Sequence, residues 1–161
     1  MDAVNEANLD WAETDRGAVH FRRKRLAAAT ENEDLGCSLY ELPSGKRGWP
    51  YHYHTGNAEA VYVIAGEGEL RGPDDEKITL EKGTYVALPA GPSGAHRLRN
   101  TGDSPLRYLA FSTMNDPDVL RYPDSDKIGV MAGAPPGGNS DERFIGGFFP
   151  ADATVDYWDG E

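Results

Sequence analysis

The chain alternates apolar and polar residues over short runs. After residue 58, for example, Glu59, Val61 and Val63 share one face of an extended segment, and Tyr62 and Ile64 share the other. No stretch sustains an apolar period of 3.6 residues for ten residues. The pattern therefore predicts an all-β fold with about eight core strands and little helix.

Turn residues, mostly Gly, Pro, Asp and Ser, separate the predicted strands. The strands are expected at residues 18–26, 36–42, 51–54, 59–64, 69–71, 77–80, 84–88, 95–100 and 106–113. Short strands at such even spacing are typical of a jelly-roll barrel. We assign residues 36–114 to the barrel, 1–35 to an N-terminal arm with a first strand, and 115–161 to a C-terminal extension. Residues 66–68 are predicted to be the turn of a hairpin.

The C-terminal extension is rich in aromatic residues. These are Phe144, Phe148, Phe149, Tyr157 and Trp158. Exposed aromatic side chains and open sheet edges both favour a partner surface. We therefore expect the extension to pack on the barrel or on a second copy, and the protein to be a homodimer.

Three of the four histidines fall on the barrel strands. His52 and His54 are two residues apart, so they project from the same face of a strand, while Glu59 and His96 would arrive from two other strands. Three neutral imidazoles and one carboxylate suit divalent iron, manganese, nickel, zinc or copper. We predict one metal site at these four residues. His20, in the first strand, is expected to be structural.

The spacing of these residues resembles the two motifs of the cupin superfamily. The first motif runs from His52 through His54 and Glu59 to Gly66. The second contains Gly83, Pro89, Gly91, His96 and Asn100. The sequence departs from the family pattern in two loops: the leading glycine is Gly45 or Gly48, and four residues instead of two separate Gly91 from His96. The resemblance implies the cupin barrel, also called a double-stranded β-helix, and the same four metal ligands.

Further segments are similar to a group of small single-domain cupins from bacteria and archaea. They are residues 38–43, 45–47, 49–54, 122–125 and 127. Members of this group are named sugar-phosphate isomerases or are uncharacterised, which implies a metal-dependent enzyme acting on a small oxygenated molecule. In that reaction Glu59, Tyr62 or Tyr85 would move the proton, and Lys46 and Arg47 are candidates for a phosphate contact.

Two other functions fit the same ligand set. One is an iron-dependent dioxygenase, because other cupins use these ligands for oxygen chemistry. The other is a non-catalytic module that binds a small ligand and keeps the metal for structure. The sequence alone does not choose among these three, nor does it decide whether the protein is an enzyme.

Composition narrows the range of partners. The net charge is −11, from 27 acidic and 16 basic residues, which disfavours nucleic acid because phosphate would be repelled. No apolar run reaches the roughly 18 residues of a membrane span, and the N-terminus lacks the pattern of a secretory signal. The single cysteine, Cys37, forms no internal disulfide and is expected to be a small core residue. We expect a cytoplasmic protein whose ligand is a small molecule.

Overall fold

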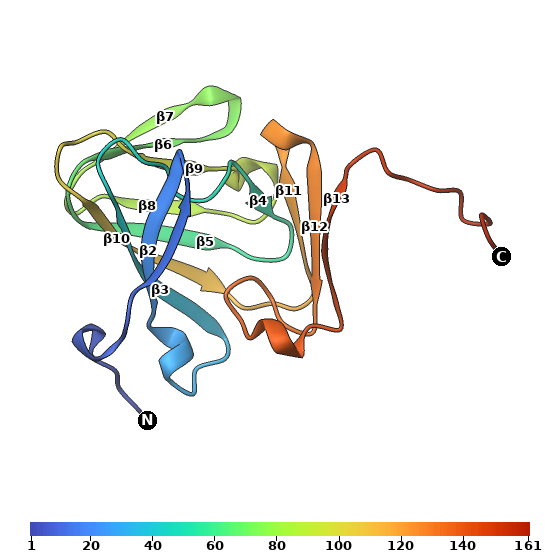
Figure 1. Ribbon diagram of the computed structural model, residues 1–161, viewed down its shortest axis with the longest axis horizontal. Coiled ribbons are helices and arrows are strands. Elements are labelled where there is room, and N and C mark those ends of the chain that lie inside the picture. The colour runs from blue at the N-terminus through green and yellow to red at the C-terminus, as the bar shows by residue number, and fades with distance from the viewer.

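The computed structural model describes all 161 residues as strands joined by turns and single turns of 3-10 helix (Figure 1). The strands are β1 (Ala12–Arg16), β2 (Val19–Arg25), β3 (Leu35–Leu42), β4 (Tyr53–His54), β5 (Glu59–Ala65), β6 (Gly68–Arg71), β7 (Lys77–Leu80), β8 (Tyr85–Leu88), β9 (Arg97–Asn100), β10 (Leu106–Thr113), β11 (Asp118–Tyr122), β12 (Lys127–Ala132) and β13 (Ile145–Pro150). The 3-10 turns are η1 (Glu6–Asn8), η2 (Ala27–Ala29), η3 (Pro73–Asp75), η4 (Pro92–Gly94), η5 (Pro123–Ser125) and η6 (Ser140–Glu142). None of these helical turns is long and apolar enough to cross a membrane. The all-β, jelly-roll prediction is confirmed.

A large sheet packs against two smaller ones. The large sheet has the order β1-β2-β3-β10-β5-β8, and the smaller sheets have the orders β7-β6-β9 and β13-β12-β11-β4. The smaller sheets meet where His52 and His96 form an antiparallel bridge. The His52 N–H donates to the His96 carbonyl at 3.2 Å, and the His96 N–H donates back at 2.9 Å. The metal-site candidates therefore lie where these two sheets join.

The hydrophobic core fills the space between the sheets. It contains Phe21, Tyr40, Leu42, Val61, Val63, Leu70, Leu80, Val86, Leu88, Leu98, Leu106 and Tyr108. These side chains follow the alternation of their strands, since Val61 and Val63 are buried whereas Tyr62 between them is exposed. Cys37 in β3 is half-buried, and burial raises the pKa of its thiol, which fits a structural residue and not a nucleophile.

The turn predicted at residues 66–68 is not a hairpin. β5 pairs with β8 and β10, whereas β6 pairs with β7 and β9, so this turn carries the chain from the large sheet to a smaller one. Gly66 has a φ of +84°, and a Cβ there would lie 2.4 Å from the Pro105 carbonyl oxygen. The crossing therefore needs glycine for its backbone angle and for its close approach to the neighbouring loop.

After Thr113 the chain continues into three further strands that join a sheet of the site. β11 pairs with β4, the strand that carries His54, and β12 and β13 extend the same sheet. The strands expected from the sequence do not include β11, and alternation does not say which distant segments pair. The segment that follows β13 extends away from the sheets (Figure 1).

The last aromatic residues, Tyr157 and Trp158, lie beyond the strands of the extension. Tyr157 and Trp158 contact each other with ring centroids 4.8 Å apart, but their side chains are 82% and 73% exposed. Phe148 and Phe149 on β13 are also about half exposed. These residues are available to a second copy, and the homodimer stays a prediction.

Replacement of Gly66 by alanine should destabilise the fold more than replacement of Gly83. Both glycines have positive φ, at +84° and +93°, but a Cβ at Gly83 meets nothing within 4 Å. Both variants carry the conformational cost, and only Gly66→Ala adds a clash with backbone, so we expect it to lose roughly 1–3 kcal/mol more. Urea denaturation of the two variants measures the difference. Equal losses would show that the approach to Pro105 is not tight.

Candidate metal centre

The site is built on backbone pairing between strands that are distant in sequence. His52 is paired with His96, and His54 on β4 is paired with Leu120 on β11. All three histidines are buried, and the Glu59 side chain is 22% exposed. The inward parity predicted for His52 and His54 therefore brings both imidazoles inside the protein.

The three imidazoles and the carboxylate converge. Ligand atoms of His52, His54 and Glu59 all lie within 4.8 Å of one another. The Nε2 atoms of His54 and His96 are each 3.5 Å from the same Glu59 oxygen, Oε2. The rings of His52 and His96 have centroids 4.8 Å apart. The structure thus brings together all four residues that the sequence singled out, although the group within 4.8 Å does not include His96.

Each histidine uses its Nδ1 atom for a contact outside the cluster. His52 Nδ1 is 2.8 Å from the Pro50 carbonyl oxygen, and His96 Nδ1 is 2.9 Å from the Gly94 carbonyl oxygen. A carbonyl oxygen can only accept, so both Nδ1 atoms carry the proton. In the neutral ring the Nε2 lone pair is then free to bind a metal ion.

Asp118 gives His54 the same tautomer. Its Oδ2 atom accepts from His54 Nδ1 at 2.6 Å, and its Oδ1 atom accepts from the backbone N–H of Gly56 at 3.0 Å. The carboxylate is almost completely buried. Burial raises the pKa of Asp118, but the hydrogen bonds from His54 and Gly56 outweigh it, so the pKa lies below its ordinary value.

The electrostatics keep two of the three imidazoles neutral. Burial, reinforced by His96 and His54, lowers the pKa of His52 to about 3, and burial lowers the pKa of His96 as well. At His54 burial also lowers the pKa, but Asp118 and Glu59 outweigh it and the pKa is raised. His54 is therefore the most basic of the three rings.

The loop between His54 and Glu59 is held by Asn57. Its Oδ1 atom accepts from the Asn115 backbone N–H at 2.7 Å and from the Thr113 hydroxyl at 3.0 Å, and its amide donates to the Asn115 carbonyl at 3.0 Å. Asn57 is almost fully buried. It ties the start of β5 to the end of β10 and so fixes where Glu59 enters the site.

Two aromatic residues, Tyr122 and Phe148, lie next to His52 in order of contact. The Tyr122 ring stacks on the His52 ring with centroids 5.7 Å apart, and Phe148 on β13 contacts the other edge of this tyrosine. Burial, with Asp118 and Glu59, raises the pKa of Tyr122 to about 12, so its hydroxyl keeps its proton. The ammonium of Lys127, directly across from Tyr122 on β12, lies 5.6 Å from the centroid of its ring.

Several residues proposed from the sequence lie elsewhere. Tyr62 and Tyr85 are 42% and 63% exposed, on the outer side of β5 and β8, so neither is a base for this site. The Lys46 ammonium donates to the Gly17 carbonyl, and Arg47 lines a pocket with Arg97 on the outer face of another sheet. Neither of these two residues is a phosphate contact for the histidine cluster.

Two further residues of the motif analysis are structural. His20 is paired with Glu13 at 2.7 Å on the edge of the large sheet, as expected for a structural residue. Asn100, the last residue of the second motif, is completely buried, and its side chain is hydrogen-bonded to the turn at residues 102–104. Its amide donates to the carbonyls of Leu42 and Ser104, and its carbonyl oxygen accepts from Gly102.

Comparison with known proteins identifies the barrel. Residues 38–112 match the family described as Cupin domain. This segment, just under half of the chain, has the sequence pattern of a cupin domain. The predicted resemblance is therefore confirmed, and with the departures in the two motif loops the four candidate ligands still lie close together.

Curated relatives match about half of the chain. Glucose-6-phosphate isomerase of Thermococcus litoralis is 37% identical over 89 residues, which cover 48% of this chain and 46% of that protein. The protein of the same name from Thermococcus onnurineus matches to the same extent. The chain thus spans about half the length of the curated relatives it matches.

Solved structures share the fold over a longer range. A structure named sugar phosphate isomerase from Silicibacter pomeroyi superposes with a TM-score of 0.79 over 98% of both chains, at 21% identity. A structure named predicted oxalate decarboxylase from Thermotoga maritima superposes with a TM-score of 0.61, over 70% of this chain and 98% of that one, at 22% identity. At these identities the likeness concerns the fold, and the two names show that the fold hosts different chemistries.

Replacement of Asp118 by asparagine should change the tautomer of His54 alone. The new amide NH₂ can donate to His54 Nδ1, and the ring proton then moves to Nε2. His52 and His96 keep their Nδ1 protons, because backbone carbonyls hold them. Long-range ¹⁵N–¹H correlation spectra of the metal-free protein distinguish the tautomers. A variant in which all three rings stay unchanged would show that Asp118 does not set the tautomer of His54.

Proposed function

We propose that His52, His54, Glu59 and His96 bind one divalent metal ion, and that the protein is a metal-dependent enzyme for a small oxygenated substrate. The observation that supports this most directly is the common orientation of the imidazoles. Three buried rings use Nδ1 for outside contacts and leave Nε2 free. Two of these Nε2 atoms approach one Glu59 oxygen at 3.5 Å.

The donor set fits manganese, iron, nickel or zinc. Three imidazole nitrogens and one carboxylate are a mixed set that all four ions accept, and His54, the most basic ring, would give up any Nε2 proton to the competing ion. The Nδ1 contacts to Asp118 and to two carbonyl groups are those that commonly orient metal-binding histidines. A bound ion would act as a Lewis acid that polarises a substrate carbonyl.

Within this class we propose isomerisation of a phosphorylated sugar. The carboxylate of Glu59 is the base that remains after Tyr62 and Tyr85 are excluded. Through the oxygen that does not bind the ion, it would take a proton from the carbon beside the carbonyl and return it to the carbonyl carbon, while the hydroxyl proton passes to the former carbonyl oxygen. Tyr122 keeps its proton and can donate a hydrogen bond to a substrate oxygen. Lys127, exposed beside Tyr122, is placed to contact a phosphate group.

The comparisons support this reaction through the names of the matched proteins. The curated relatives are named glucose-6-phosphate isomerases, and a structural relative is named a sugar phosphate isomerase. The matched segment covers about half of the curated relatives. The activity of those proteins is therefore a hypothesis for this chain, to be tested directly.

Replacement of His96 by alanine should remove most of the bound metal and leave the fold intact. One of four ligands is lost, while the core of valines, leucines and aromatic residues does not involve this ring. We expect about one ion per chain in the unmodified protein and less than about a tenth of that in the variant, by mass spectrometry of protein purified without chelators. His20→Ala is the matched control, because His20 is a histidine outside the cluster.

Full metal content in His96→Ala would mean that the ion binds elsewhere. Circular dichroism of both variants checks that the fold is retained. The metal found in the unmodified protein also identifies the ion to use in the activity assay.

Replacement of Lys127 by glutamine should weaken binding of a phosphorylated sugar without changing the metal content. We expect KM for glucose 6-phosphate to rise about tenfold while kcat stays similar, because a charge-assisted contact to the phosphate is lost. The assay follows conversion to the ketose in metal-loaded protein. Lys82→Gln, which removes an exposed lysine from the turn before β8, is the control.

Two results would contradict the isomerase proposal. One is the absence of conversion with metal-loaded protein under both aerobic and anaerobic conditions. The other is consumption of oxygen with turnover, which would favour the dioxygenase instead. Neither result would affect the proposed metal site, which the metal content tests separately.

A further inference from the structure

Cations crowd the outer face of the β7-β6-β9 sheet, away from the histidine cluster. Lys77, Arg71 and Arg97 lie side by side on the three strands, because Arg71 is directly opposite both of the others. Two residues further along β9, Arg99 forms an antiparallel backbone bridge with Arg47. Like charges directly opposite each other destabilise a sheet, so three such pairs on one face are costly for a fold alone.

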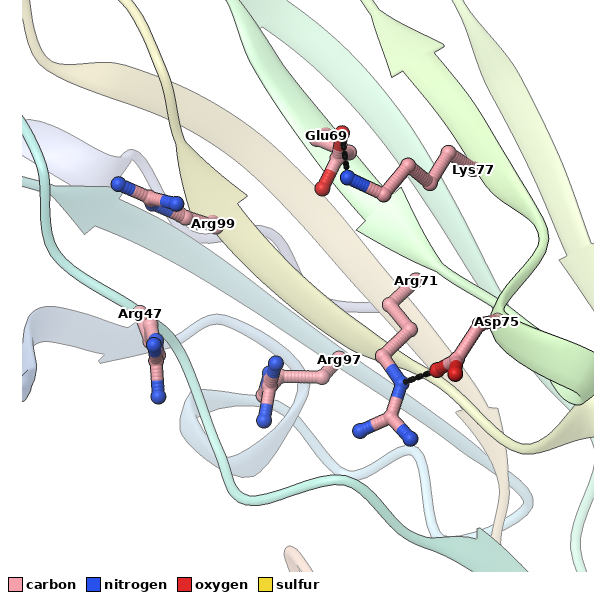
Figure 2. Close-up of a pocket in the computed structure, with 7 residues that line it drawn as sticks. All are labelled: Arg47, Glu69, Arg71, Asp75, Lys77, Arg97 and Arg99. Atoms are coloured by element: carbon pink, nitrogen blue, oxygen red, sulfur yellow. Dashed lines mark hydrogen bonds and ion pairs between the residues drawn. The ribbon is translucent and has the colours of Figure 1, made fainter.

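These cations surround a cavity of about 370 Å³ (Figure 2). The lining consists of four arginines, one lysine and two carboxylates, Glu69 and Asp75, and includes no hydrophobic residue. The whole chain has a net charge of −11, so this face has the opposite sign to the molecule. The cavity therefore attracts anions locally, and it has no apolar surface against which a nucleobase or another aromatic ring of a ligand could pack.

The carboxylates present neutralise only part of this charge. Lys77 pairs with Glu69 at 3.2 Å and Arg71 with Asp75 at 2.5 Å, and these are the ion pairs drawn in Figure 2. Asp124, from η5, bridges Arg71 and Arg97 at 2.7 and 3.2 Å.

Arg47 and Arg99 have no carboxylate partner among the residues drawn in Figure 2. Burial, together with the neighbouring Arg47 and Arg71, lowers the pKa of Arg97, as expected where cations outnumber anions. Two guanidinium groups are thus left free to bind a further anion.

We propose that this cavity is a binding site for a small phosphate-bearing polyanion, such as pyrophosphate or the phosphate end of a phosphorylated metabolite. Guanidinium groups match phosphate oxygens with paired hydrogen bonds, and a ligand with two or more negative charges balances the excess cations. A cavity of this volume holds a small molecule, and its polar lining selects for charge instead of apolar contact. The proposal does not depend on the metal site.

Calorimetric titration of pyrophosphate into the full chain tests this site. The protein is first treated with a chelator and dialysed at low ionic strength, so that no bound metal competes for the anion. We expect saturable binding to the unmodified protein and an affinity lower by about tenfold for each guanidinium removed in Arg99→Gln and in Arg47→Gln/Arg99→Gln. Titrations with orthophosphate, glucose 6-phosphate and sulfate then rank the ligands.

Arg16→Gln/Arg25→Gln is the matched control, because it removes two exposed arginines from the ends of β1 and β2, outside the cavity, and changes the net charge equally. It should bind pyrophosphate within about threefold of the unmodified protein. Without anion, the melting temperature of Arg47→Gln/Arg99→Gln should be unchanged or higher, because a like-charge pair is removed. This separates loss of binding from loss of folding.

Three outcomes would overturn the proposal. They are no saturable binding to the unmodified protein, an affinity of Arg47→Gln/Arg99→Gln within threefold of the unmodified protein, and an equal loss of affinity in the control pair. The last outcome would show that pyrophosphate responds to the total charge and not to this cavity.

Discussion

The pairing of the His52 and His96 backbones is the contact on which the arrangement of the site depends. Two hydrogen bonds join segments 44 residues apart, and they connect the two smaller sheets at the point where the imidazoles meet. The imidazole rings of both residues are candidate metal ligands. The backbone bridge between His52 and His96 therefore also sets the separation of these two ligands. The position of the candidate site is thus set by the backbone and not by flexible side chains alone.

The sequence was sufficient for the parts of the site that follow from local parity. His52 and His54 face one way because they are two apart on an extended segment, and Glu59 enters beside Val61 and Val63 for the same reason. The spacing of the two motifs then indicated which strands must meet. Alternation also identified Tyr62 as an outward residue, and it should have excluded this side chain as a base.

The parts that the sequence did not predict are contacts between distant segments. Asp118 is an acid at the start of a short strand, and no local pattern distinguishes it from the many exposed acids of this chain. Its role becomes visible only when β11 is placed beside β4. The same holds for the outward arginines of β6 and β9, which alternate as on any solvated strand until their register places them opposite one another.

The contact between His54 and Asp118 spans 64 residues, and this distance has a consequence for how the protein is made. The segment that matches the cupin family ends at residue 112, so all four candidate ligands are synthesised before the acid that orients one of them. During translation the large sheet can therefore form first. His54 Nδ1 then has no partner, and the ring can adopt either tautomer. Only when β11 emerges and pairs with β4 does the ring acquire a defined donor atom. A chain that stopped before β11 would therefore carry all four candidate ligands but lack the contact that sets the tautomer of His54.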